Sequence, residues 1–386
     1  MFWFSRNKPE YEPVTGLVLP GGGARNAYQV GVLRAIAEIL PAEINNPFPV
    51  ITGTSSGAIN ASMLASTAGD FRNGIDRLTG VWENFECGMV FHDDNWSALR
   101  SASHWALTLL SGGYATAHPR SVLDNQPLRE LLESHIRFAR IQHAIDRGDL
   151  RALAVTSSGY DSGMSNCYYQ GDPTINPWRR THRCGVPVEL RIDHLMASIA
   201  IPLIFPSVKV NGEYHGDGTM RETAPLSPAL HLGANRLLII GVQDESHSSG
   251  DEPLYPSIGQ ISGYVLDTLF MDRLNADIER LNRINLTIAE TGVQNVKLED
   301  KTLKPVEFLV ISPSTDLSEI VAKHMKRAPT SVRALLRGMG ALNRAGRPLI
   351  SYLLFEGPFC KELIELGYKD GLKQRGAITQ LLMPST

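Results

Sequence analysis

The chain has 386 residues, of which 43% are hydrophobic and 20% are charged. Such a chain can bury a large core, as one large α/β domain or two smaller ones, and its composition argues against intrinsic disorder. The formal net charge is -3, so no overall attraction favours nucleic acid and we expect no such partner. The four cysteines are widely spaced, and no Cys/His cluster has the spacing of metal ligands.

The beginning of the chain, residues 1–14, is predicted to be a short tail. It carries Arg6, Lys8, Glu10 and Glu12, and it lacks the apolar run and cleavage site of a secretory signal. Nowhere does the chain reach the roughly 18 uninterrupted apolar residues of a membrane-spanning helix. We therefore expect a cytoplasmic protein, or one exported by a route that leaves no cleaved signal.

Short apolar runs alternate with helical segments along most of the chain. The runs span residues 16–19, 50–52, 150–156, 237–242 and 306–311. Strands that alternate with helices are typical of a mostly parallel sheet with helices on both faces. In the first helix, after Gly23, apolar residues recur at helical spacing from Val30 to Leu40, and Pro41 is expected to end it. The sequence thus predicts an α/β fold with three layers, α/β/α.

Two stretches interrupt this alternation. Residues 85–120 have the character of an insertion, with Trp96 and Trp105 as exposed aromatic residues. Residues 166–187 contain three prolines and are predicted to form a long loop or lid rather than regular elements.

Residues 317–350 form a basic segment that is predicted to be helical. Its only acidic residue is Glu319, and apolar residues recur at helical spacing between the basic ones, which are Lys323, Lys326, Arg327, Arg333, Arg337, Arg344 and Arg347. A basic amphipathic helix is typical of peripheral contact with an anionic membrane surface. The solvated face of an ordinary packed helix would give the same pattern, so both interpretations stay open.

The pentapeptide 53–57, Gly-Thr-Ser-Ser-Gly, matches the motif G-x-S-x-G. It follows an apolar run and precedes a helix of small residues, which is the strand–turn–helix context of a nucleophile elbow. Ser55 at its centre is the candidate nucleophile, and Gly53 and Gly57 permit the close backbone approach that such a turn needs. A glycine-rich turn without catalytic meaning would give the same pentapeptide, so the motif alone does not decide.

Three consecutive glycines, Gly21, Gly22 and Gly23, stand between the first strand and the first helix. Backbone N–H groups at a helix N-terminus can bind an anion, and the loop is therefore a candidate oxyanion hole. Dinucleotide binding is disfavoured, because Asn26 stands where G-x-G-x-x-G requires its third glycine.

Two later motifs complete an ordered set. Residues 197–206 read Ala-Ser-Ile-Ala-Ile-Pro-Leu-Ile-Phe-Pro, and Asp217 and Gly218 follow them. Together with the glycine loop and the elbow, these motifs resemble the patatin-like phospholipases over roughly the first 230 residues. The resemblance implies a patatin-like catalytic core over 15–226 and a C-terminal part, 227–386, that completes the α/β unit.

The resemblance also implies a function. Family members cleave acyl ester bonds of phospholipids or related lipids with a Ser/Asp dyad, through an acyl-enzyme, and without a metal or organic cofactor. Ser55 is then the nucleophile and Asp217 the base, of phospholipase A or lysophospholipase type. The amides of Gly21, Gly22 and Gly23 would supply the oxyanion hole, with Arg25 supporting the loop. Oligomeric state stays open.

Departures and alternatives remain. Asn26 and Thr219 stand where the family usually has small residues, which concerns substrate fit more than mechanism. A Ser-His-Asp hydrolase would need a late histidine, but His324 lies in the basic segment without a matching motif. His215 is interpreted as a packed strand residue rather than a triad member. A non-catalytic lipid-binding protein on the same fold is a further alternative.

Overall fold

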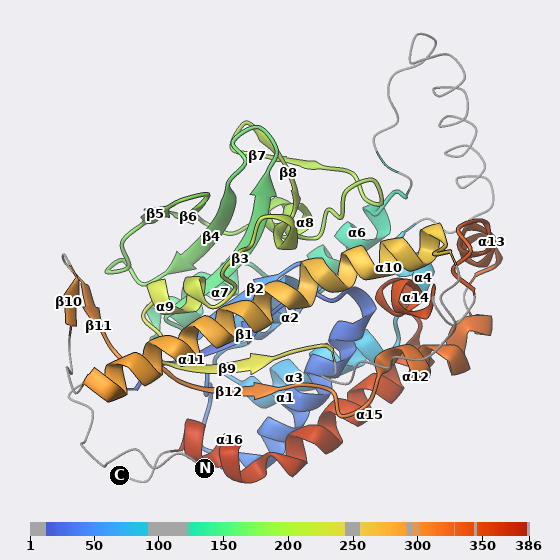
Figure 1. Ribbon diagram of the computed structural model, residues 1–386. Coiled ribbons are helices and arrows are strands. Elements are labelled where there is room, and N and C mark those ends of the chain that lie inside the picture. The colour runs from blue at the N-terminus through green and yellow to red at the C-terminus, as the bar shows by residue number, and fades with distance from the viewer. Residues whose placement is uncertain are drawn as a thin grey trace.

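The computed structural model describes residues 13–91, 121, 123–243, 255–291, 296–298, 301–327, 329–342 and 346–383. Figure 1 shows these residues as a coloured ribbon. Most of the predicted tail and of the predicted insertion, including Trp96 and Trp105, lies outside the described residues.

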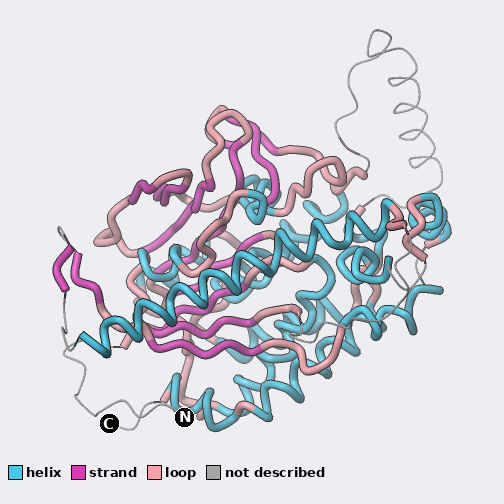
Figure 2. Tube along the Cα trace, viewed as in Figure 1, coloured by secondary structure: helices cyan, strands magenta, loops and turns pink. Residues whose placement is uncertain are grey.

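The centre of the molecule is a parallel group of strands. Its members are β1 (Thr15–Leu19), β2 (Val50–Thr54), β3 (Ala152–Gly159), β9 (Arg236–Ile240) and β12 (Glu307–Ile311). They lie side by side in the order β12-β9-β1-β2-β3, and every neighbouring pair is parallel. All five predicted strands are therefore present, and the predicted mostly parallel sheet is confirmed. Figure 2 shows these strands grouped between helices.

The sheet continues beyond β3 where a loop or lid was predicted, and that prediction is wrong. Residues 166–187 lie largely in β4 (Ser165–Gly171), β5 (Trp178–Arg180) and β6 (Arg183–Pro187). β4 is antiparallel to β3, and β6 is parallel to β4. Pro173 and Pro177 fall between strands and Pro187 ends one, so none removes an N–H from a strand interior. Pairing with the distant β3, which local composition does not reveal, makes the segment regular.

A further antiparallel pair of strands carries Asp217. It consists of β7 (Val208–Val210) and β8 (Glu213–Asp217), and β8 also pairs with β3. The hairpin β10 (Val296–Leu298) and β11 (Lys301–Leu303) forms a separate small sheet. β8 thus brings Asp217 to the parallel strands.

Helices cover the sheet. Those before β9 are α1 (Ala27–Ile39), α2 (Ser56–Ala65), α3 (Phe71–Glu83), α4 (Cys87–Val90), α6 (Gln126–His135), α7 (Ala139–Asp146), α8 (Ile192–Ser198) and α9 (Ser227–His231), with 3-10 turns at Gly23–Asn26 and Gly218–Met220. α1 ends before Pro41, as predicted.

The C-terminal part is mainly helical. It contains α10 (Ile258–Asp267), a π-helical turn (Thr268–Asp272), α11 (Arg273–Thr291), α12 (Leu317–His324), a 3-10 turn (Met325–Arg327), α13 (Thr330–Gly338), α14 (Arg347–Leu353), α15 (Gly357–Lys373) and α16 (Arg375–Leu382). The basic segment is thus divided among several short helices. In Figure 1, α10 and α11 form one long helix that crosses in front of the parallel strands. In the part of the chain that the structure describes, no helix is both long and apolar enough to cross a membrane.

Candidate active site

Ser55 occupies a strained turn between β2 and α2. Its φ is 55°, in the left-handed region that a residue with a side chain rarely adopts. The strain persists because the neighbouring backbone is closely packed on both sides of the turn. A Cβ at Gly57 would lie 2.1 Å from the Leu19 carbonyl oxygen, and one at Gly53 would lie 2.5 Å from the Gly57 oxygen. Both motif glycines are therefore required by close backbone contact.

The elbow is directed at Asp217, which lies at the end of β8. Ser55 Oγ donates a hydrogen bond to Asp217 Oδ2 at 2.6 Å. The other carboxylate oxygen, Oδ1, accepts from the Thr219 amide at 2.9 Å and from the Thr219 hydroxyl at 2.7 Å. One oxygen thus faces the serine while the other is held in place. Thr219, where the family usually has a smaller residue, contributes a hydroxyl donor that we did not predict from the sequence.

The residues of the 197–206 motif position this pair. Ser198 Oγ accepts from the Ser55 amide at 2.9 Å and donates to the Thr156 carbonyl at 2.7 Å. The Ala200 carbonyl accepts from the Asp217 amide at 2.8 Å. A Cβ at Gly218 would lie 2.2 Å from the Thr156 oxygen, so this glycine lets the loop after Asp217 pack on β3. The motif therefore links the Ser55 turn to the Asp217 carboxylate.

Burial makes Asp217 a stronger base than an ordinary aspartate. Ser55 and Asp217 are 2% and 1% exposed. Burial raises the pKa of Asp217 to about 6, although the hydrogen bonds from Ser55 and Thr219 act in the opposite direction. The carboxylate is then mostly ionised at neutral pH and holds a proton more readily than a solvated aspartate.

A second buried carboxyl group, Glu222, lies beside the elbow. Its Oε1 accepts from the Thr54 hydroxyl at 2.9 Å. Burial raises the pKa of Glu222 to about 7, and the charge of Asp217 adds to this shift. No sequence motif indicated Glu222, because its position depends on how the loop after Asp217 folds back on β2.

The two histidines considered as triad members lie elsewhere. The ring nitrogens of His215 contact Ser157 Oγ at 3.0 Å and Tyr168 Oη at 3.3 Å, and burial lowers the pKa of this histidine. His324 Nε2 contacts Glu362 Oε2 on α15 at 2.8 Å. Neither ring is hydrogen-bonded to Ser55 or Asp217.

The glycine loop lies against the elbow. A Cβ at Gly21 would be 2.9 Å from Ser55 Cβ, and one at Gly23, whose φ is 56°, would be 2.2 Å from the Tyr352 oxygen. The Gly22 amide donates to Ser56 Oγ at 3.2 Å. A donor role for Gly22 therefore requires that its amide exchange this hydrogen bond for one to the substrate.

Arg25 connects the glycine loop to two C-terminal helices. Its guanidinium is buried and donates to Ser351 Oγ at 2.7 Å, to Asp267 Oδ1 at 3.0 Å and to Tyr352 Oη at 2.9 Å. It also stacks 3.8 Å from the centre of the Tyr352 ring. These contacts join the loop to α10 and α14. The role of Arg25 in an oxyanion hole stays a prediction.

Phe270 covers the site. It lies in the π-helical turn and is 4% exposed. The Cβ position of Gly21 is 2.6 Å from the Phe270 ring and 2.9 Å from Ser55 Cβ, so the ring packs close to Ser55. Ser55 is 2% exposed, so a ligand could reach it only after residues packed around it, such as Phe270, moved.

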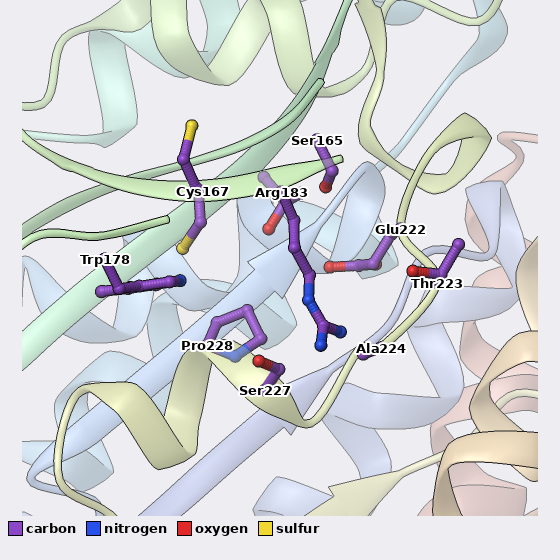
Figure 3. Close-up of a pocket in the computed structure, with 11 residues that line it drawn as sticks. Ser165, Cys167, Trp178, Arg183, Glu222, Thr223, Ala224, Ser227 and Pro228 are labelled. Atoms are coloured by element: carbon purple, nitrogen blue, oxygen red, sulfur yellow. The ribbon is translucent and has the colours of Figure 1, made fainter. Parts of the chain in front are cut away.

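A small cavity lies near the site, and neither Ser55 nor Asp217 lines it. Its lining includes Thr156, Cys167, Trp178, Arg183, Glu222 and Ser227. In Figure 3 the Arg183 side chain extends toward the space between Glu222 and Ser227. Among the described residues, no group of three or more His, Cys, Asp or Glu side chains is placed to hold a metal ion.

A serine on a strained strand-to-helix turn, hydrogen-bonded to a buried carboxylate, has the arrangement of a nucleophile with its base. The chain belongs to the patatin-like phospholipase family, whose pattern it matches over residues 17–230. No curated protein matches it.

Solved structures of human GIVD cytosolic phospholipase A2 are similar in part. Its complex with methyl gamma-linolenyl fluorophosphonate is 14% identical, with a TM-score of 0.43, and the match covers 96% of this chain and 59% of that one. A second structure of the same enzyme is 12% identical, with a TM-score of 0.45, and the match covers 96% of this chain and 60% of that one. The chain thus matches about three fifths of the length of these proteins.

Proposed function

We propose that this protein is a lipid acyl hydrolase of phospholipase A or lysophospholipase type. Ser55 acts as the nucleophile and Asp217 as the only general base, without a metal or organic cofactor. The observation that carries the proposal is the 2.6 Å hydrogen bond from Ser55 Oγ to the buried Asp217 carboxylate. Membership of the patatin-like phospholipase family supports a lipid ester as the substrate.

The reaction follows from this geometry. Asp217 accepts the Ser55 proton as Ser55 Oγ attacks the acyl carbonyl, and the oxygen that becomes negative faces the amides of the glycine loop. Collapse of the tetrahedral intermediate breaks the ester bond, and Asp217 gives its proton to the leaving alcohol. Asp217 then removes a proton from water as the water oxygen attacks the acyl-enzyme. When this second intermediate collapses, the bond to Ser55 Oγ breaks, Asp217 returns the proton to Ser55 Oγ, and the fatty acid is released. One carboxylate thus serves both halves of the reaction.

The partner of such an enzyme is a lipid surface. We propose that the basic segment contributes to contact with anionic lipid, because Lys326, Arg327 and Arg337 are exposed there. Division of this segment into short helices limits any continuous apolar stripe, so its contribution is chiefly electrostatic.

Covalent labelling tests the proposed function. A fluorophosphonate probe should modify the peptide that contains Ser55, and Ser55→Ala should lose both the label and the hydrolysis of p-nitrophenyl esters. Ser134→Ala, at an exposed serine on α6, is the matched control and should keep both. Label that persists in folded Ser55→Ala would overturn the assignment of the nucleophile.

A further inference from the structure

The helix α10 presents large apolar side chains to solvent. Four of its residues and one that precedes it are 46–96% exposed: Tyr255, Ile258, Ile261, Tyr264 and Val265. Residues 255–266 contain no charged side chain. A contiguous uncharged apolar face of this kind is unusual for a surface that only meets water.

The opposite face of α10 is packed through small residues. Gly259 and Gly263 are buried, and Leu266 lies on the same side. A Cβ at Gly259 would lie 2.5 Å from Ala341 Cβ, and one at Gly263 would lie 3.0 Å from the Leu349 amide. The helix therefore cannot rotate to bury its large residues, because the packed side has no room for them. This inverts the usual arrangement, in which the large apolar residues face the core.

One basic residue lies close to this apolar face in the chain. The Gly259 amide donates to the Met339 carbonyl at 2.8 Å, and Ser257 Oγ donates to the Gly340 carbonyl at 3.1 Å. The end of α13, where Arg337 is exposed, is therefore fixed to the first turn of α10. Exposed aliphatic and tyrosine side chains, with the cationic Arg337 close by, fit the boundary of an anionic lipid layer, where acyl chains meet charged headgroups.

The same helix reaches the candidate active site. α10 continues into the π-helical turn that carries Phe270, whose ring packs on Gly21 next to Ser55. Its last residue, Asp267, accepts hydrogen bonds from Arg25 at 3.0 Å and from the Tyr352 hydroxyl at 2.6 Å. The helix with the exposed apolar face is therefore continuous with Phe270 and is hydrogen-bonded to Arg25, which contacts the glycine loop's neighbours.

We propose that the exposed face of α10 docks on a lipid surface and that this docking moves Phe270 away from Ser55. The docking surface is defined as Tyr255, Ile258, Ile261, Tyr264 and Val265. Docking supplies apolar contact that water does not, which offsets the loss of the packing of Phe270. The opening step rests on the proposed function, whereas the docking step does not.

Vesicle binding tests the docking step without catalysis. The full chain carrying Ser55→Ala should sediment with phosphatidylcholine vesicles that contain phosphatidylserine. Adding Ile261→Asp and Tyr264→Asp should weaken this binding about tenfold or more, since burial of large apolar side chains is lost. Leu286→Asp is the matched control, because Leu286 is 52% exposed on α11, about 30 Å along the helix from Tyr264. Equal binding by the docking variant and the control would overturn the proposal.

A second measurement distinguishes loss of the docking surface from loss of the folded structure. Tryptophan fluorescence of Tyr264→Trp should be quenched by lipids brominated in their acyl chains, well above the quenching of the unsubstituted protein, and that of Leu286→Trp should not. Thermal unfolding confirms the fold of each variant. If α10 instead joins two copies of the chain, the docking variant will change the sedimentation coefficient and leave vesicle binding intact, which also overturns the proposal.

Labelling kinetics test the opening step. Vesicles should accelerate the reaction of Ser55 with a short-chain fluorophosphonate several-fold in the unsubstituted protein and not in the Ile261→Asp/Tyr264→Asp variant. An unchanged rate with bound vesicles would overturn the opening step. A protein that docks through α10 but never labels at Ser55 would disprove the proposed function and leave the docking surface standing.

Discussion

At the scale of residues, the candidate site depends on the different hydrogen-bond donors of the two Asp217 carboxylate oxygens. One accepts from Ser55 and the other from the amide and hydroxyl of Thr219. The carboxylate is therefore held in a fixed orientation, and it contacts Ser55 directly, without an imidazole between them. His215, two residues earlier on β8, is hydrogen-bonded to Ser157 and Tyr168 instead.

Substitutions of Asp217 and of His215 should show which of the two residues is needed for ester hydrolysis. Asp217→Asn should lower ester turnover by about 10²–10⁴-fold, because an amide cannot accept the serine proton. His215→Phe should keep much of the activity while losing some stability, since it removes two buried hydrogen bonds. Steady-state kinetics with p-nitrophenyl esters, together with thermal unfolding, measures both. A folded but inactive His215→Phe beside an active Asp217→Asn would require a histidine-based mechanism.

The raised pKa of Asp217 predicts a pH dependence. Activity should fall as the pH drops through about 6, because the protonated base cannot accept the serine proton. Stability should change in the opposite direction. A carboxyl group with a raised pKa contributes stability that is present below its unfolded value and is lost as the pH rises through about 6. Relative to Asp217→Asn, the unsubstituted protein should lose about 2 kcal/mol of unfolding free energy between pH 4 and pH 8.

A substitution of Glu222 tests whether Asp217 produces the fall in activity at low pH. Its pKa, at about 7, lies close to that of Asp217, so either carboxyl could produce the acid limb of the pH–rate profile. Glu222→Gln can still accept from the Thr54 hydroxyl, and we expect it to keep a limb near pH 6. A flat profile in Glu222→Gln would show that Glu222, and not Asp217, controls the reaction.

At the scale of elements, close helix packing holds the C-terminal part to the core. α1 and α15 meet at Gly31 and Gly367, where an added Cβ would lie 1.9 Å from the Ile364 oxygen and 2.1 Å from the Tyr28 oxygen, respectively. Such a crossing leaves no space for even one methyl group. The apolar spacing that predicted α1 gave no indication of which helix would cover it.

Alanine substitutions at a packed and at an exposed helical glycine should therefore change the free energy of unfolding in opposite directions. Gly31→Ala should lower the free energy of unfolding by about 1–3 kcal/mol through overpacking. Gly80→Ala, in the exposed part of α3 where nothing lies within 4 Å of the added Cβ, should raise it by about 0.5–1 kcal/mol. Denaturant unfolding of both variants measures the difference. Equal stability of Gly31→Ala and the unsubstituted protein would mean that the two helices can separate without cost.

At the scale of the whole molecule, the sheet extends beyond the residues that match the family. The match ends at residue 230, whereas β9 and β12 come later and lie on the far side of β1. β1 is buried on both edges only because β9 pairs with it. The last helices then return to cover α1, so segments from the two ends of the chain lie together (Figure 1). Family core and C-terminal part thus share one sheet.

The sequence by itself determined the features that depend on neighbouring residues. Apolar runs located the five parallel strands, Pro41 marked the end of α1, and the ordered glycine, serine and aspartate motifs indicated the family. These signals are local, because strand propensity, a strained turn and a glycine contact each act through a few bonds of backbone. The catalytic roles of Ser55 and Asp217 stay predictions for the experiments above.

Only the tertiary structure decided the features that join distant segments. It turned the proline-containing stretch 166–187 into strands by pairing it with β3, placed Glu222 against Thr54, and laid Phe270 over Ser55. It also left the large residues of α10 outside and its glycines inside. Each of these results depends on burial and shape fit between residues far apart in the chain, and local periodicity does not encode which surfaces will meet.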